Sequence, residues 1–251
     1  MKKSILLILC LVALFQFPGT TKASAPTPLQ PEDDSVPALS FSFNADLVSR
    51  YIWRGLPLDL HANIQPYASV TYKNFTLGAW GSYALSNPYA EADLYLSYDL
   101  GAFTFTVSDY YNEDETDMSF SDYFQYSDKD TIVTPHSLEG QITFNGTDNF
   151  PLSVTVATFF YGNDRNENNK NCYSTYFELG YEHTLGENTL SYFLGGTVAK
   201  GYYADKAAVV NLGCKASREL KLSESTSLPV SAAFILNPEA KDIFFVFSLT
   251  F

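Results

Sequence analysis

Between residues 39 and 55, apolar and polar side chains alternate along the chain, which reads LSFSFNADLVSRYIWRG. The odd positions are apolar or aromatic except for Ser49, and the even positions are mostly polar and include Asp46, Arg50 and Arg54. Because successive side chains of a strand point to opposite faces, this pattern predicts one strand with an apolar face and a polar face. The apolar face would cover the core of a soluble sheet, or would contact lipid in a membrane barrel.

Eleven further alternating runs follow, and together they favour the membrane barrel. Most runs have about nine to twelve residues, the length that a tilted strand needs to cross the hydrocarbon. Connections after even-numbered runs are mostly short, whereas several after odd-numbered runs are long and acidic, as is typical of outer-membrane barrels. A soluble β-sandwich would have shorter strands and no such alternation of loop lengths. We therefore predict an all-β fold, an antiparallel transmembrane β-barrel of about 12 strands, with runs at 39–55, 63–73, 75–85, 91–100, 103–111, 136–144, 152–161, 173–184, 189–199, 207–217, 227–237 and 243–251.

The first 25 residues have the form of a secretory signal peptide. Lys2 and Lys3 precede an apolar run, residues 5–17, and a small-residue cleavage site follows at Ala23-Ser24-Ala25. The apolar run is too short for a membrane-spanning helix. Residues 26–37 (PTPLQPEDDSVP) read as an extended periplasmic leader. We expect the barrel itself, residues 38–251, in the outer membrane of a Gram-negative bacterium.

The charge of the chain argues against nucleic acid as a partner. Removing Lys2, Lys3 and Lys22 with the signal peptide leaves 12 of the 15 basic residues beside 28 acidic ones, a net charge of −16. Such a surface repels phosphates. Cys172 and Cys214 match no metal-site spacing, and their expected positions on different strands argue against a disulfide. We expect no metal and no cofactor.

Charged side chains on the polar phase of the predicted strands would line the lumen of the barrel. Rings of charge bias which ions pass through a pore, and six acids against three bases predict a mild cation preference. Alternatively, these charges pair across a lumen that is too narrow to conduct, because twelve strands fall between a filled eight-stranded barrel and an open sixteen-stranded one. The candidate residues are Asp46, Arg50, Arg54, Glu91, Asp93, Glu139, Glu178, Glu182 and Lys215.

Aromatic residues gather near the predicted strand ends, where they would form girdles at the two membrane interfaces. Gly55 reads as an ordinary turn glycine, although a loop that folds inward and narrows the mouth is the alternative. The outer girdle would hold Tyr51, Trp53, Tyr83, Tyr110, Tyr161 and Tyr173, and the inner girdle Tyr72, Phe75, Tyr98, Phe103 and Tyr181.

The stretch Ser49-Arg50-Tyr51-Ile52-Trp53-Arg54-Gly55 resembles the signature S-x-Y-x-aromatic-R-G of the TorF-like porin family, whose members carry it at the end of the first strand. That family also has a strand in which acidic and apolar residues alternate, as at 91–95 here, and a terminal strand rich in aromatic residues. This chain departs from the family at Arg50, where members often carry an acid. The resemblance covers essentially the mature chain and implies an outer-membrane barrel with a pore. Outer-membrane barrels commonly end on an aromatic strand that the barrel-assembly machinery reads, so this resemblance implies that machinery as a partner through the strand ending at Phe251.

The sequence thus predicts a porin-like channel, monomeric or trimeric, for small hydrophilic solutes or ions, in contact with outer-membrane lipids and lipopolysaccharide. One alternative is a non-conducting structural or adhesive barrel whose acidic external loop, residues 112–134, carries the function. Another is a barrel lipid hydrolase that uses His136 and Ser137, although neither lies in a motif typical of such enzymes. We therefore predict no enzymatic activity.

Overall fold

The computed structural model describes residues 39–113, 122–127, 134–223 and 226–251, and within these ranges the regular elements are all β-strands. None of the described segments is a helix long and apolar enough to cross a membrane. The predicted signal peptide, the leader and parts of the acidic loop at 112–134 lie outside the described residues. The strands are β1 (Leu39–Val48), β2 (Tyr51–Trp53), β3 (Leu56–Asp59), β4 (Asn63–Tyr72), β5 (Phe75–Ala84), β6 (Ala90–Leu100), β7 (Phe103–Glu113), β8 (His136–Phe144), β9 (Leu152–Gly162), β10 (Thr175–Leu185), β11 (Asn188–Thr197), β12 (Ala208–Lys221), β13 (Ser227–Asn237) and β14 (Asp242–Thr250).

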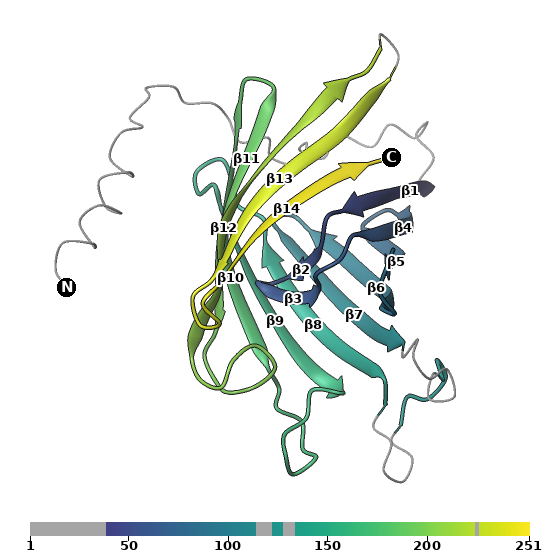
Figure 1. Cartoon of the computed structure of the whole chain (residues 1–251), viewed down its shortest axis with the longest axis vertical. Helices are drawn as coiled ribbons and strands as arrows, with labels where there is room; N and C mark the ends of the chain where they lie inside the picture. The colour runs from purple at the N-terminus through teal and green to yellow at the C-terminus, as the bar shows by residue number, and fades with distance from the viewer. Residues whose placement is uncertain (1–38, 114–121, 128–133, 224–225) are drawn as a thin grey trace, which may run out of the picture.

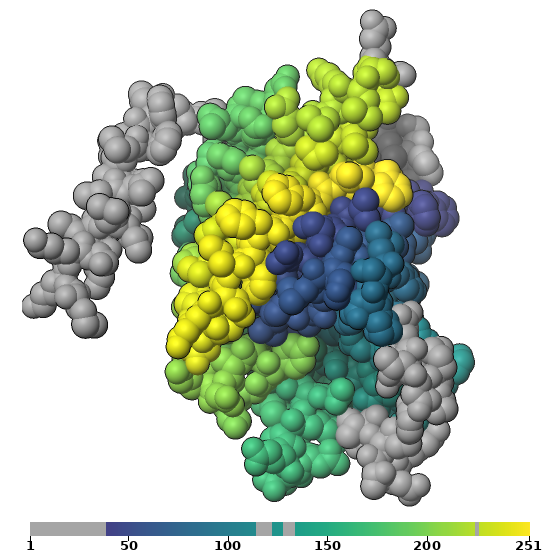
Figure 2. All heavy atoms as spheres, in the orientation of Figure 1, coloured from purple at the N-terminus to yellow at the C-terminus, as the bar shows by residue number. Residues whose placement is uncertain are grey.

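Twelve of these strands form one closed antiparallel barrel, in the order β1-β14-β13-β12-β11-β10-β9-β8-β7-β6-β5-β4, with β4 returning to β1 (Figure 1). The predicted fold class is therefore confirmed. The pairing is uneven around the ring: β1 pairs with β4 along its whole length but with β14 only from Asp46 to Val48. Figure 2 shows β14 (yellow) crossing beside β1 (purple) at this seam.

The two faces of the barrel wall differ as the alternation predicts. Large apolar side chains point outward, and among them Phe41 and Phe43 of β1 are 77% and 82% exposed. The inner face carries hydroxyl groups that pair between neighbouring strands, such as those of Thr71 and Thr76 at 2.8 Å. The outward residues include Leu77, Leu94, Leu96, Phe105, Val107, Phe177, Leu179, Phe245 and Phe247. The structure thus has an apolar outer face and a polar inner face.

The connections are also unequal at the two ends of the barrel. At one end, here called the short-turn end, two-residue turns at 73–74, 101–102 and 186–187 join neighbouring strands. At the other end, here called the long-loop end, the connections include residues 163–174 and 198–207. Cys172 and Cys214 are both free, so the prediction that they form no disulfide is confirmed.

The prediction of one continuous strand over residues 39–55 is wrong beyond Val48. The chain bends at Ser49 and Arg50 and then forms a two-stranded sheet, β2–β3, here called the lumen hairpin (Tyr51–Asp59). Its turn residues Arg54 and Gly55 have φ values of 49° and 79°, which is typical of the two-residue turn that joins hairpin strands. Figure 1 shows this hairpin inside the ring of strands. A strand of the barrel wall and a strand of a hairpin show the same alternation of apolar and polar residues, so this pattern does not distinguish between them.

Three aromatic residues consequently lie elsewhere than in the predicted outer girdle. Tyr51 and Trp53 belong to the lumen hairpin, and Tyr51 is only 8% exposed. Tyr110 of β7 pairs with Asp93 and Ser137 in register and donates a hydrogen bond inside the barrel. In contrast, Tyr83, Tyr161 and Tyr173 are exposed.

Candidate functional site in the barrel lumen

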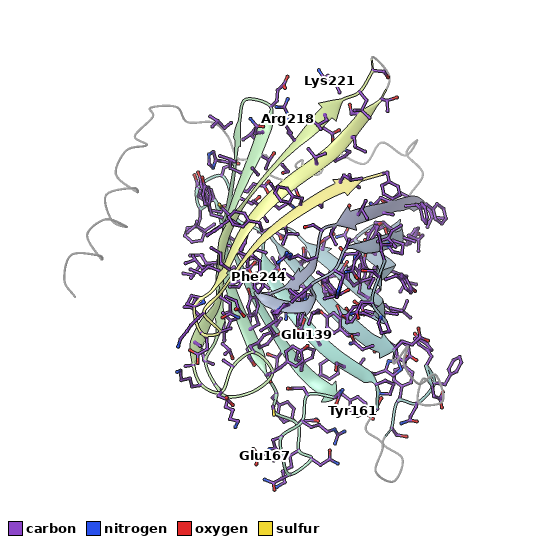
Figure 3. The ribbon with its side chains drawn as sticks, viewed as in Figure 1. Glu139, Tyr161, Glu167, Arg218, Lys221 and Phe244 are labelled. Atoms are coloured by element: carbon purple, nitrogen blue, oxygen red, sulfur yellow. The ribbon has the colours of Figure 1, made fainter. Side chains whose placement is uncertain are left out.

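The tip of the lumen hairpin carries Arg54, whose guanidinium group reaches Glu139 (labelled in Figure 3) on the inner face of β8. Arg54 Nη1 donates to Glu139 Oε1 at 2.5 Å and Nη2 donates to Oε2 at 2.9 Å, so the ion pair is bidentate. The two side chains are 10% and 1% exposed. Arg54 also donates to the Tyr203 hydroxyl at 2.5 Å and to Gln141 Oε1 at 3.1 Å. Charge-assisted, bidentate bonds of this kind attach the hairpin firmly to the wall.

Two tyrosine hydroxyls complete the surroundings of the Glu139 carboxylate. Tyr110 donates to Oε2 at 2.9 Å, and Tyr203, from the β11–β12 connection, donates to Oε1 at 3.3 Å. The Arg54 guanidinium also lies 4.4 Å from the Trp53 ring centre and 4.7 Å from the Tyr176 ring centre. Burial disfavours the Arg54 cation, but the bond to Glu139 outweighs this effect and raises the pKa of Arg54 above its usual value. Arg54 is therefore charged.

Aromatic rings pack the hairpin against the inner wall around this ion pair. Trp53 lies 5.6 Å from Tyr110, 6.0 Å from Tyr202 and 5.9 Å from Tyr203, measured between ring centres. These rings adjoin a buried cluster inside the barrel towards the long-loop end, whose members are Phe159, Tyr176, Tyr203 and Val210. Tightly packed aromatic rings leave little room for water in this half of the barrel.

Gly55 lets the hairpin tip approach the main chain of β12 closely. A side-chain carbon on Gly55 would lie 1.9 Å from the carbonyl oxygen of Val210, far inside van der Waals contact. The Gly55 carbonyl in turn accepts a hydrogen bond of 3.1 Å from the buried side chain of Asn237 on β13. Gly55 is thus a turn glycine, as predicted, and its turn belongs to a hairpin that folds inward; glycine is required there by both its φ value and its contact.

Glu91 and Asp93 lie on the inner face of β6 and are 4% and 7% exposed. The Tyr89 hydroxyl donates to Glu91 Oε2 at 2.7 Å, and the main-chain N–H of Tyr111 donates to Asp93 Oδ1 at 3.4 Å. Tyr51 of the hairpin also bonds to Glu91, and its pKa is raised because it is buried and lies beside that carboxylate. Glu91 thus faces Tyr51 of the hairpin, whereas Arg54 pairs with Glu139.

The base of the lumen hairpin is closed by Asp59, which is 4% exposed. Its Oδ1 lies 2.8 Å from His61 Nδ1, and its Oδ2 accepts a hydrogen bond of 3.0 Å from Asn63. Burial favours the protonated form of Asp59, but the bonds from His61 and Asn63 outweigh it and lower the pKa of Asp59 below its usual value. Asp59 is therefore an ionised anchor between β3 and β4.

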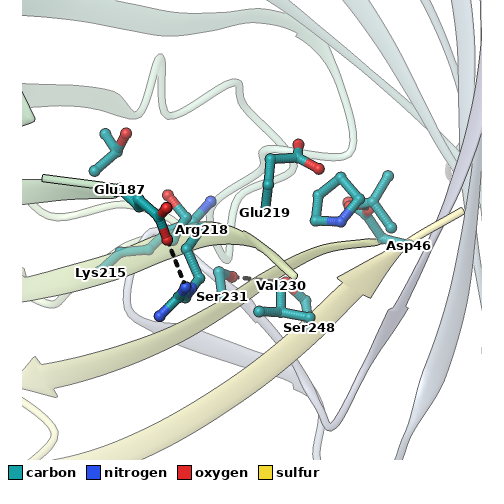
Figure 4. Close-up of a pocket in the computed structure, with 12 residues that line it drawn as sticks. Asp46, Glu187, Lys215, Arg218, Glu219, Val230, Ser231 and Ser248 are labelled. Atoms are coloured by element: carbon teal, nitrogen blue, oxygen red, sulfur yellow. Dashed lines mark hydrogen bonds and ion pairs between the residues drawn. The ribbon is translucent and has the colours of Figure 1, made fainter. Parts of the chain in front are cut away.

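The short-turn half of the lumen is hollow and polar. A cavity of about 330 Å³ lies against β1 and β11–β14, and Figure 4 shows Asp46, Lys215 and Glu219 around it. Thr250 donates to Asp46 Oδ1 at 2.5 Å. A second cavity of about 290 Å³ is lined by residues that include Glu178 and Glu182. This half of the barrel can hold water and small polar solutes.

The structure therefore divides the predicted lumen residues into groups. Arg54 and Glu139 form the ion pair that attaches the hairpin, and Glu91 and Asp93 are buried beside it. The polar half holds Asp46, Glu178, Glu182 and Lys215. Arg50 lies at the bend before β2, and its buried Nε atom has no hydrogen-bond partner among the described residues.

The aromatic residues that hold the hairpin are absent from the predicted site. Tyr176 lies at the start of a run assigned to the wall, and Tyr202 and Tyr203 lie in a connection. The only signal in the sequence is the tyrosine pair in the segment GYYADK, an unusual place for aromatic residues in a polar loop. No family model and no curated protein sequence matches this chain.

Proposed function

We propose that this protein is an outer-membrane channel for small hydrophilic solutes or ions, in which the lumen hairpin limits the passage. The apolar outer face and polar inner face of the closed barrel support a membrane location, because a barrel in lipid must present this pattern. The likeness of residues 49–55 to the TorF-like porin signature agrees with the proposal. By the predicted topology, the long-loop end faces the exterior.

The observation that carries the proposal is the contrast between the two halves of the lumen. The short-turn half contains polar cavities of about 330 and 290 Å³. The long-loop half is occupied by the lumen hairpin, which Arg54 and Glu139 hold in place. Solutes that enter from the short-turn end thus meet the hairpin before they leave the barrel, and the hairpin determines what can pass.

The charges in the polar half support the mild cation preference. Because Glu139 is neutralised by Arg54, the acids of the polar half remain to attract ions. Asp46, Glu178, Glu182 and Glu219 border the two cavities, with Lys215 as an opposing base, while Arg218 is paired with Glu187 at 2.9 Å. An excess of carboxylates along a pore favours cations over anions.

Planar-bilayer recording with refolded protein tests the proposal. We expect a small single-channel conductance for the natural chain and a larger one when residues 51–58 are replaced by a short glycine-serine linker. The matched control shortens the polar loop at 163–171, which leaves the hairpin intact. Absence of current from both the natural and the hairpin-deleted barrel would refute the channel and favour the alternative of a structural barrel, which the filled long-loop half also fits.

The hydrolase alternative has less geometric support. His136 and Ser137 are neighbours in β8, so their side chains point to opposite faces of the wall. The His136 ring nitrogens are both engaged, one with Asp109 and one with a main-chain carbonyl. A nucleophilic serine needs a hydrogen-bonded base, and these two residues do not form such a pair. Phospholipase assays on the refolded barrel check this conclusion directly.

A further inference from the structure

His136, the first residue of β8, is fully buried although its side chain belongs to the outer face of the barrel. Residues 122–127 of the β7–β8 connection cover it. The Tyr126 ring stacks on the imidazole with centres 4.0 Å apart and planes 18° apart, and Tyr123 contacts its edge at 5.2 Å. Phe124, between them, is 85% exposed. The segment 122–127 is therefore attached to the outer wall around one histidine.

Both nitrogen atoms of the His136 ring face hydrogen-bond acceptors. Nδ1 lies 2.8 Å from Asp109 Oδ1 on β7, and Nε2 lies 2.7 Å from the main-chain carbonyl oxygen of Tyr123. A carbonyl oxygen only accepts, so Nε2 must carry a proton. The contact with Asp109 needs a second proton between Nδ1 and Oδ1. Both contacts are made at once when Nδ1 and Nε2 each carry a proton and Asp109 accepts the one from Nδ1.

Several further groups face this pair. From the covering segment, Tyr126 donates to Asp109 Oδ2 at 2.8 Å, and the same segment contains Asp122. From β7, Tyr111 lies 5.0 Å from the imidazole, and Asp93 on β6 interacts electrostatically with Asp109. From β9, Tyr161 bonds to the Tyr126 carbonyl. The ion pair given for Asp109 among the described residues is the one with His136, at 2.8 Å.

We propose that His136 and Asp109 form a pH-sensitive clasp that holds residues 122–127 against the outer wall of the barrel. Loss of one proton leaves a neutral imidazole with a single N–H facing two acceptors. Either the bond to Asp109 or the bond to the Tyr123 carbonyl is then lost, and an unpaired polar atom stays buried on the outer wall. The segment is consequently bound when both ring nitrogens of His136 carry protons and released when one of them loses its proton, so its attachment depends on pH.

Hydrogen exchange of the full mature chain, refolded in detergent micelles, tests the clasp. After correction for intrinsic exchange rates, protection of peptides covering 122–127 should fall roughly 10- to 100-fold between pH 5.5 and 8.5, the equivalent of one hydrogen bond to a charged group. In His136→Gln the same peptides should be weakly protected at both pH values. The matched control is His183→Gln, since His183 stacks on Tyr192 elsewhere on the wall and should leave the pH response intact.

Nitrogen-15 NMR of labelled histidine gives an independent measurement. At pH 5.5 both ring nitrogens of His136 should carry protons, and at pH 8.5 only one. Equal protection of 122–127 at the two pH values in the natural chain, or an unchanged pH response in His136→Gln, would overturn the clasp. So would a singly protonated His136 at pH 5.5 with the segment still protected.

Discussion

Replacing Arg54 by alanine should release the lumen hairpin, and the cost can be worked out from its contacts. The guanidinium group forms two hydrogen bonds to Glu139 and one each to Tyr203 and Gln141. After the substitution, Glu139 is a buried carboxylate without its cation. Breaking a buried ion pair by removing one partner costs about 3–5 kcal/mol. We expect the free energy of unfolding to fall by that amount.

The assays are urea unfolding of the refolded barrel and single-channel recording on the same preparation. Arg54→Ala should lower the unfolding midpoint and increase both the conductance and the frequency of open events, because the hairpin is no longer fixed. The unfolding midpoint and the conductance of Arg54→Lys should lie between those of the natural chain and Arg54→Ala, because an ammonium group keeps the charge but loses the bidentate geometry. Removing both partners in Arg54→Ala with Glu139→Ala should recover part of the stability, because no buried charge is left.

The matched control is Arg218→Ala. Arg218 also forms an ion pair, with Glu187 at 2.9 Å, but the two side chains are 44% and 73% exposed. Exposed pairs contribute about 0–1 kcal/mol, so the stability should hardly change. If Arg54→Ala unfolds at the same urea concentration as Arg218→Ala, the hairpin is not held by the buried pair, and a passage limited by Arg54 is refuted.

Three further predictions concern the turn, the base and the polar half of the lumen. Gly55→Ala should lower the free energy of unfolding in urea by several kcal/mol, because Gly55 has a φ of 79° and the new carbon would lie 1.9 Å from a carbonyl oxygen of β12. As a control, Gly101→Ala should lower it by only about 1 kcal/mol, because Gly101 has a φ of 59° and open space around it. Folding lowers the pKa of Asp59, so its contribution to stability is present above about pH 4 and is lost as the pH falls further. The difference in unfolding free energy between the natural chain and Asp59→Asn should therefore shrink on acidification. A difference that does not change with pH would contradict this. Glu178→Lys should shift the reversal potential in a salt gradient towards anion preference, and an unchanged potential would show that Glu178 does not border the ion path.

The wall of the barrel could be predicted from sequence because its strands obey a simple rule. Each wall strand carries large apolar side chains on one face only. An alternation of apolar and polar residues with a period of two identifies that face when it extends over nine or more residues. Runs such as 136–144 and 227–237 agree with β8 and β13 residue for residue. The same alternation predicts charged side chains on the inner face, where the structure has Glu139.

The lumen hairpin could not be predicted in the same way. Residues 51–53 continue the alternation of apolar and polar positions of β1. Such an alternation cannot show whether the apolar face contacts lipid or the aromatic residues inside the barrel. Arg54-Gly55 was the one available signal, since two residues with positive φ form the tight turn of a hairpin. The partners of the hairpin come from connections and strands far along the chain, such as Tyr203 and Asn237, and only the closed barrel brings them together.

The lumen hairpin and the segment 122–127 are attached to the same pair of strands from opposite sides. On β8, Glu139 points inward to Arg54 and His136 points outward to the covering segment. On β7, Tyr110 bonds to Glu139 inside and Asp109 bonds to His136 outside. Neighbouring residues of a strand alternate between faces, so a short stretch of two strands can hold an internal obstruction and an external loop at once. The long-loop end of β7 and β8 is therefore a part of the wall where the covering segment and the lumen hairpin are attached within a few residues of each other.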